Sequence, residues 1–216
     1  MSEKTRKIAV ITGDIVGSTA LGPAKLERAM AALAASAKVQ AGWHGESLRF
    51  TRNRGDGWQV VLARPEMALR SALAFRAALR AQGSEFDSYF GIAKGDASLA
   101  LNNDLNAETG NVFKHSGDNL EGLKEIRNLD VRMGYVGDGE INAVIALADH
   151  LSQGWTPPQA AALLPLLNPD AAVTQTQVAK KLGKSRQAVA KSLEAAHYRP
   201  LSRALNSMET GLKTDA

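Results

Sequence analysis

The sequence contains no cysteine, so disulfide bonds, thiolate metal ligands and thiol nucleophiles are all excluded. It also lacks long apolar runs near its start. The apolar stretch at residues 8–11 is far too short for a signal-peptide core or a membrane span. We therefore expect a cytoplasmic protein that makes no membrane contact.

Aromatic residues are few, at 5% of the chain, whereas apolar residues make up 44% and charged residues 22%. These proportions are typical of a globular protein rather than a disordered one. A length of 216 residues suits one large domain, or an ordinary domain followed by a small one.

Acidic residues are scarce near the C-terminal end of the chain. Residues 171–203 carry seven Lys or Arg side chains and one Glu, a local charge of +6, whereas the net charge of the whole chain is +4. A basic segment beside a nearly neutral body is typical of proteins in which one module binds polyanionic DNA.

Strand-like and helix-like patterns alternate through the first two thirds of the chain. We expect helices at 24–39, 65–81 and 117–126, and strands at 7–12, on both sides of the 54–57 turn, at 88–93 and at 131–135. This βαββαβ order, extended by a helix and a strand, predicts an α+β fold with a ferredoxin-like domain. Such a domain has a mostly antiparallel sheet with helices on one face. The arginines Arg70, Arg76 and Arg80 of an amphipathic helix are expected on a solvated face.

After the Gly-Asp-Gly sequence at 137–139, helical patterns separated by turns replace the strand patterns. We therefore expect a sheet-containing domain at 1–138, a connecting helix at 139–155, and a small all-α domain at 156–216. Within the last of these, residues 157–167 and 200–208 are predicted helices.

Residues 176–193 have the pattern of a helix-turn-helix that binds double-stranded DNA. Ala179 is small where the helices cross, Gly183 suits a left-handed turn, and Val189 fills the space between the helices. The candidate DNA-binding residues are Gln177, Lys184, Ser185, Arg186, Gln187 and Lys191, of which Ser185 is also the predicted N-cap of the second helix. One such helix reads few bases, so we expect a homodimer. The alternative interpretation is a solvated basic hairpin.

Two aspartates beside glycines, Asp14 and Asp56, are predicted to lie at neighbouring strand ends. Two carboxylates close together repel each other, which favours a divalent cation or a shared proton between them, and oxygen ligands favour Mg²⁺ or Mn²⁺. Gly17, Ser18 and Thr19 lead into a helix start whose free amides suit a phosphate. The alternative interpretation is that both aspartates are turn formers or helix caps.

The run Gly-Asp-Ile-Val-Gly-Ser-Thr at 13–19 and the turn at 55–57 resemble the two metal-binding motifs of class III nucleotidyl cyclases. With Phe-Lys-His-Ser-Gly-Asp-Asn-Leu at 113–120 and the helix-turn-helix, most of the chain more closely resembles the SatD-like family of bacterial proteins. This resemblance implies a cyclase-like palm domain fused to a DNA-binding module. It further implies Asp14 and Asp56 as metal ligands, the carbonyl of Ile15 as a third, and Arg52 in the place of a base-reading lysine.

The chain departs from the cyclase pattern after Gly117. Leu120 and Glu121 stand where cyclases have Val-Asn, and Glu125 stands where they have the arginine that stabilises the transition state, although Lys124 and Arg127 are nearby. These differences argue against cyclisation. Our leading hypothesis is a bacterial transcriptional regulator whose first domain senses a nucleotide or a divalent metal. The alternatives are an active nucleotidyl cyclase or related nucleotide-processing enzyme, and a DNA-binding protein whose first domain serves dimerisation.

Overall fold

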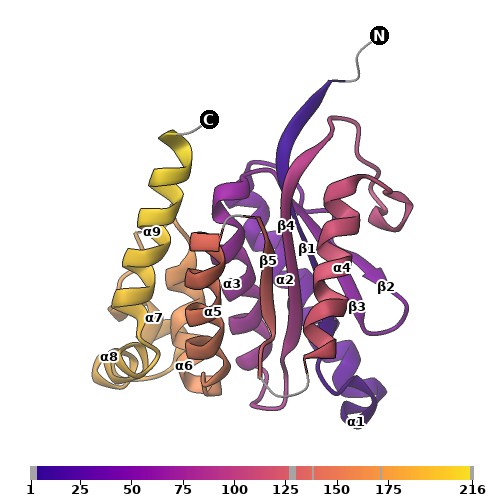
Figure 1. Cartoon of the computed structure of the whole chain (residues 1–216). Coiled ribbons are helices and arrows are strands. Elements are labelled where there is room, and N and C mark those ends of the chain that lie inside the picture. The colour runs from indigo at the N-terminus through magenta and orange to yellow at the C-terminus, as the bar shows by residue number, and fades with distance from the viewer. Residues whose placement is uncertain (1–3, 127–129, 138, 171, 215–216) are drawn as a thin grey trace.

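The computed structural model describes residues 4–126, 130–137, 139–170 and 172–214. These residues form a five-stranded sheet with helices on both faces (Figure 1). The strands are β1 (Thr5–Ile15), β2 (Thr51–Asn53), β3 (Gly57–Leu62), β4 (Ser88–Ser98) and β5 (Met133–Val136). The helices are α1 (Ser18–Leu21), α2 (Pro23–His44), α3 (Ala68–Arg80), α4 (Asn111–Glu125), α5 (Gly139–Gln153), α6 (Pro157–Leu163), α7 (Gln175–Leu182), α8 (Arg186–Ala195) and α9 (Tyr198–Thr214). Short 3-10 turns are η1 (Pro65–Met67), η2 (Leu105–Ala107) and η3 (Leu164–Leu167).

The strands lie in the order β2-β3-β1-β4-β5, with β1 at the centre. β1 runs antiparallel to both of its neighbours, β2 pairs antiparallel with β3, and β5 joins β4 in parallel. Residues 8–11 of β1 are fully buried because alternate side chains face opposite sides of the sheet and both sides are covered. Ile8 and Val10 lie in one buried cluster, and Ala9 and Ile11 lie in the other.

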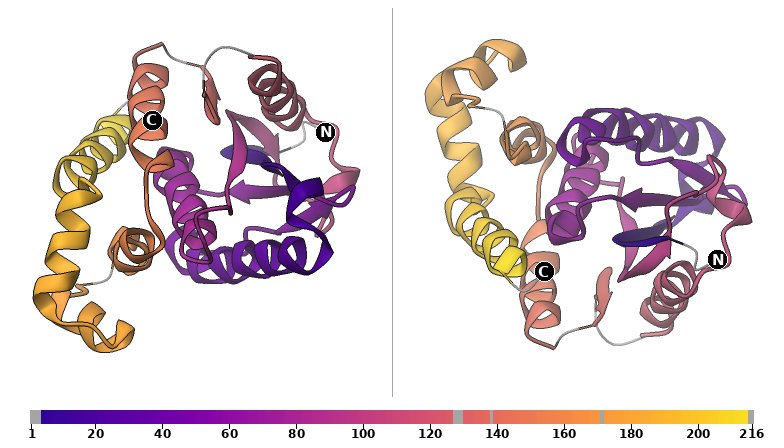
Figure 2. Two further views of the ribbon diagram at one scale, coloured as in Figure 1. Left: turned by 90° about the horizontal axis from the view of Figure 1, so that it is seen from below. Right: turned by 90° about the horizontal axis from the view of Figure 1, so that it is seen from above.

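Helices cover both faces of this sheet (Figure 2). α2 and α3 lie on one face, and α4 packs along β1 and β4 on the other. Gly91 of β4 permits this close approach, because a Cβ atom there would lie 2.2 Å from the carbonyl oxygen of Ser116. The expectation of helices on one face is therefore wrong. The helix predicted at 117–126 begins earlier, at Asn111, and covers the second face.

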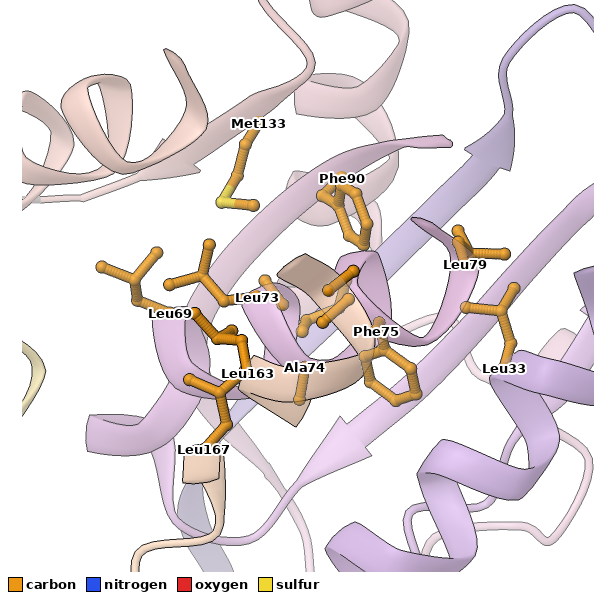
Figure 3. Packing of buried hydrophobic residues seen from close by; sticks show 14 of the residues in the cluster. Leu33, Leu69, Leu73, Ala74, Phe75, Leu79, Phe90, Met133, Leu163 and Leu167 are labelled. Carbon is orange, nitrogen blue, oxygen red and sulfur yellow. The ribbon is translucent and has the colours of Figure 1, made fainter. Parts of the chain in front are cut away.

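α3 is buried along its whole length because it lies between the sheet and the C-terminal helices. Figure 3 shows Leu69 and Leu73 of α3 grouped with Leu163 and Leu167 from α6 and η3. On the other side, residues from the sheet and α2 complete the same core, which continues into α7, α8 and α9.

The three arginines of α3 are buried rather than solvated, so the expectation of a solvated face is wrong. Arg70, Arg76 and Arg80 are only 3%, 0% and 8% exposed. Arg70 pairs with Glu209 of α9 at 2.6 Å, and Arg76 pairs with Asp149 of α5 at 2.7 Å. The C-terminal helices cover this side of α3, and the pattern of α3 alone cannot show it.

The C-terminal helices follow the predicted turns. α5 packs on β5 and α3, and the indole of Trp155, just after α5, donates a hydrogen bond to the carbonyl oxygen of Ala196 at 3.3 Å. α6 and η3 together span the predicted 157–167 helix, and α9 extends beyond the predicted 200–208 helix at both ends. In the part of the chain that the structure describes, none of the helices combines the length and the hydropathy needed to cross a membrane.

Candidate functional site

Asp14 and Asp56 lie at one edge of the sheet, where β1 ends beside the turn between β2 and β3. Asp14 stands opposite Gly57 in the β1–β3 register. The backbone N–H of Ile15 donates to the carbonyl oxygen of Asp56 at 3.2 Å, which holds the turn against the end of β1. Both aspartates line the same groove, so the strand order brings their carboxylates together.

This groove, with a volume of about 730 Å³, is bounded by β1, the 54–57 turn, the η2 loop and α4. Charged side chains of both signs line it. The carboxylates are those of Asp14, Asp56, Glu108 and Glu121, and the cationic groups are those of Arg54, Lys114 and Lys124. The groove therefore has groups suited to a cation and groups suited to a phosphate in one volume.

Among the carboxylates that line the groove, Asp14 is the one whose pKa is clearly shifted. Burial raises its pKa above the usual range, and the charges of Asp56 and Glu121 raise it as well. Lys124 opposes them, because its Nζ lies 2.9 Å from Oδ2 of Asp14 and stabilises the carboxylate. The hydrogen bond to Asp14 in turn raises the pKa of Lys124. Lys124, noted in the sequence as a nearby cation, thus faces the groove directly.

Residues 17–19, predicted to hold phosphate, contact the groove through one side chain. The hydroxyl of Ser18 donates a hydrogen bond to the carboxylate of Asp56. Gly17 adopts a left-handed conformation, with φ of 62°, before the four-residue α1, and Gly17, Ser18 and Thr19 are not among the residues that line the groove.

Arg52, expected at the base-reading position, turns away from the groove. Its guanidinium donates to the carbonyl oxygen of Gly55 at 2.6 Å and pairs with Glu27 of α2 at 2.6 Å, so it braces the turn. Arg54 and Lys114 line the groove instead. The sequence reasoning did not single out Arg54, which adjoins Asp56, or Lys114, although Lys114 lies in the 113–120 run.

The oxygen donors on this edge are of the kind that Mg²⁺ and Mn²⁺ prefer. Asp14 and Asp56 supply carboxylates, and Ser18 adds a hydroxyl that donates a hydrogen bond to the Asp56 carboxylate. Within the described ranges, no three His, Cys, Asp or Glu side chains are grouped so that they could hold a metal ion. Mg²⁺ is usually held by one or two carboxylates together with phosphate oxygens, so two carboxylates fit a cation that arrives with a phosphate ligand.

The second candidate site is the surface formed by α7 and α8. α7 ends at Gly183, whose φ of 61° is the left-handed conformation that favours glycine. Ser185 then caps α8, because its hydroxyl accepts a hydrogen bond from the backbone N–H of Ala188 at 3.1 Å. Ala179 and Val189 are buried, at 5% and 2% exposure. The predicted turn, N-cap and helix contact are therefore confirmed as local geometry.

Four of the six candidate DNA-binding side chains are exposed. Among the residues that the structure describes, the side chains of Lys184, Arg186, Gln187 and Lys191 have no hydrogen-bond or ion-pair partner. Ser185 is exposed but serves as the cap. Gln177 closes a capping box, because its amide oxygen accepts a hydrogen bond from the backbone N–H of Thr174 at 2.7 Å. In Figure 1, α7 and α8 lie on the opposite side of the molecule from α4.

The chain thus has two polar surfaces, the carboxylate groove and the exposed side of α8, separated by α3 and the sheet. No protein-family model matches the chain, and a search of curated proteins also finds no match.

Proposed function

We propose that this chain is a DNA-binding regulator in which α7 and α8 form a helix-turn-helix that contacts double-stranded DNA. The observation that carries the proposal is the unpaired row of Lys184, Arg186, Gln187 and Lys191 on a capped and well-packed helix pair. Unpaired cations and amides at the start of an exposed helix suit DNA phosphates and base edges.

The topology of the sheet supports a ferredoxin-like, cyclase-like palm for the first domain. The order β2-β3-β1-β4 is that of two interleaved βαβ units, with α2 and α3 as the crossover helices. β5 extends the sheet beside β4, and α4 covers its second face. Lys114 and Lys124 of α4 line the groove.

In this proposal the groove binds a nucleotide together with Mg²⁺ or Mn²⁺. Asp14 and Asp56 would hold the cation, and Arg54, Lys114 and Lys124 would contact the phosphates. The cation, when bound, would neutralise the carboxylates and phosphate oxygens that otherwise repel one another. Because the described residues offer two carboxylates at this point, we expect weak metal binding without nucleotide and tighter binding with it.

A two-fold dimer would complete the DNA-binding function. Two copies of α8 about one helical turn of DNA apart, ~34 Å, would read two half-sites. Sedimentation velocity at micromolar concentration, with and without a DNA duplex, measures the state directly. A monomer in both conditions would remove the dimer from the proposal.

DNA binding is tested with a duplex selected in vitro from a random library on the purified full-length protein. Fluorescence anisotropy then compares the parent protein with the double variant Arg186→Ala, Gln187→Ala and with Lys191→Ala. We expect the double variant to lose preference for the selected duplex, and Lys191→Ala to reduce the slope of log affinity against log salt by about 0.9 if it contacts one phosphate.

The control is Lys38→Ala, which removes an exposed charge from α2 and should leave affinity and salt slope unchanged. Parent-like affinity and preference in the double variant would refute the assignment of α8 as the reading helix.

A second candidate function is nucleotide chemistry in the same groove, which the position of Lys124 favours. Its ammonium lies in the groove, where a cation can contact phosphate, although Glu121 lines the groove as well. Incubation of the protein with labelled nucleoside triphosphates and Mn²⁺ distinguishes the two functions. Turnover that is lost in Asp14→Asn would make the groove an active site rather than a sensor.

A further inference from the structure

A second groove lies between α2, the end of α3, η3 and α7. α2 and α3 lie on the side of the sheet away from α4 (Figure 2). Its volume is about 500 Å³, within the range of small-molecule sites. Its walls are mostly apolar and include Ala35, Val39, Leu164 and Leu182, and Val39 is 61% exposed. This groove does not share residues with the carboxylate groove.

Two polar residues of α2, Gln40 and Trp43, also line this groove. They are 0% and 4% exposed, and they lie one helical turn apart on the same side of α2. The amide nitrogen of Gln40 donates to the hydroxyl of Ser36 at 3.0 Å. Within the described part of the chain, the amide oxygen of Gln40 and the indole N–H of Trp43 have no hydrogen-bond partner.

An unpaired buried acceptor and an unpaired buried donor on residues that line one groove are unusual, because the great majority of buried polar groups are hydrogen-bonded. The two groups have complementary needs. The oxygen of Gln40 requires a donor, and the indole N–H of Trp43 requires an acceptor. A ligand that carries both a donor and an acceptor would satisfy both groups.

The small number of charged groups in the groove indicates the polarity of the rest of the ligand. Lys181 is the ionisable side chain among the described residues that line it, and the other walls are alanine, leucine, valine and proline with a few amides. A strongly charged ligand would find few partners here, whereas a flat apolar body would cover the exposed Val39.

We propose that this groove binds a neutral, mostly apolar small molecule that carries a lactam or similar cis-amide group. The N–H of the ligand donates to the amide oxygen of Gln40, and its carbonyl accepts from the indole N–H of Trp43. Both protein atoms are covered in this structure, so the two side chains must turn toward the ligand as it enters. The site does not depend on DNA or nucleotide binding.

The test uses 2-quinolone, a flat lactam, with 1-methyl-2-quinolone as the matched probe that lacks the N–H. The protein has three tryptophans, so a sample labelled with ¹⁵N-tryptophan gives three indole N–H signals, and Trp43→Phe identifies the signal of Trp43. We expect 2-quinolone to move the Trp43 signal downfield in a saturable way. The methylated probe should bind about tenfold more weakly, which is one hydrogen bond.

Two variants make the test specific. Gln40→Leu should bind both probes equally, because the acceptor that distinguishes them is gone. Ala35→Trp fills the groove from an exposed position and should abolish binding while the far-UV circular dichroism is unchanged.

An unmoved Trp43 signal at the solubility limit of 2-quinolone would overturn the proposal. Equal binding of the two probes by the parent protein would also overturn it, because the groove would then be merely apolar. A Trp43 signal that shifts with protein concentration alone would assign the groove to self-association instead.

Discussion

The ammonium of Lys124 lies 2.9 Å from Oδ2 of Asp14 and joins the end of α4 to the end of β1. Burial raises the pKa of Asp14, and the charges of Asp56 and Glu121 raise it as well, whereas this contact with Lys124 lowers it. The positively charged ammonium of Lys124 therefore lies where the proposed divalent cation would bind.

Replacement of Lys124 by Met is expected to raise the pKa of Asp14 further, because the lysine stabilises the carboxylate through a hydrogen bond and its charge. The measurement is a ¹³C NMR titration of the aspartate carboxyl signals, with Asp14→Asn to identify the signal of Asp14. Lys38→Met, on α2, is the control for loss of a positive charge. An Asp14 pKa that is the same in Lys124→Met and in the parent would contradict the pairing.

His44 should make the stability of the protein depend on pH. Burial, and to a smaller extent the charge of Arg64, lower its pKa from 6.5 to about 4. The neutral ring is bonded on both sides, since its Nδ1 accepts from the backbone N–H of Arg64 at 3.2 Å and its Nε2 lies 3.0 Å from the hydroxyl of Ser71. Protonation of the ring would break the first of these hydrogen bonds.

Because the folded-state pKa lies below the unfolded-state pKa, the unfolded chain binds the proton first as the pH falls. The stabilisation is complete above pH 6.5 and is lost between about pH 6.5 and pH 4, up to about 3 kcal/mol in total. Urea unfolding at pH 7.5, 6 and 5 measures it. His44→Gln should flatten the pH dependence over this window, whereas the exposed His115 replaced by Gln should not.

The positions of the strands and the helix-turn-helix spacing could be predicted from the sequence because each depends on local patterns. The short apolar run at residues 8–11 identifies β1, and the small, glycine and apolar positions Ala179, Gly183 and Val189 identify the turn between α7 and α8. The expected βαββαβ order also predicted that Asp14 and Asp56 lie at neighbouring strand ends, as they do.

The arginines of α3 could not be placed in this way. Arg70 and Arg76 look like a solvated stripe because their partners, Glu209 and Asp149, are far along the chain. A helix pattern reports which residues are polar, but it cannot tell solvent from a buried carboxylate on another helix. The start of α4 was missed for a related reason, since residues 114–119, apart from Ser116, are polar or small and half-exposed or exposed.

Removal of one partner from the buried pair of Arg76 and Asp149 should cost far more stability than removal of one partner from a surface pair. Arg76→Ala would leave Asp149 buried without its cation, and loss of one partner of a buried pair costs about 3–5 kcal/mol. The surface pair of Lys25 and Glu85 is 51% and 43% exposed, so Lys25→Ala should cost far less than Arg76→Ala. Urea unfolding of both variants at pH 7 makes the comparison. Similar losses would show that the Arg76 cluster does not hold α3 and α5 together.

A continuous series of polar contacts leads from the carboxylate groove to α5. The backbone N–H of Val16, next to the groove, donates to the carbonyl oxygen of Asp87 at 3.0 Å. The Asp87 carboxylate pairs with Arg76 at 3.1 Å, and Arg76 pairs with Asp149 at 2.7 Å. A change in the position of the Val16 backbone would therefore act directly on the buried cluster of Asp87, Arg76 and Asp149.

Trp155, just after α5, donates a hydrogen bond to the carbonyl oxygen of Ala196 at the end of α8. Because these contacts connect the groove to α8, we expect ligand binding at Asp14 and Asp56 to change the affinity for DNA. Ligands shift such equilibria only through different affinities for two states, and typical couplings change affinity about 5- to 150-fold.

We expect Mg²⁺ with a mixture of ATP, GTP, CTP and UTP to change the anisotropy-measured affinity for the selected duplex within that range. Asp14→Asn and Asp56→Asn should each remove the response and keep the affinity measured without ligand. Calorimetry on the same variants separates the two ways to fail: parent-like nucleotide binding would disprove the carboxylate site, whereas lost binding with no DNA response in the parent would leave a ligand site that is not a sensor.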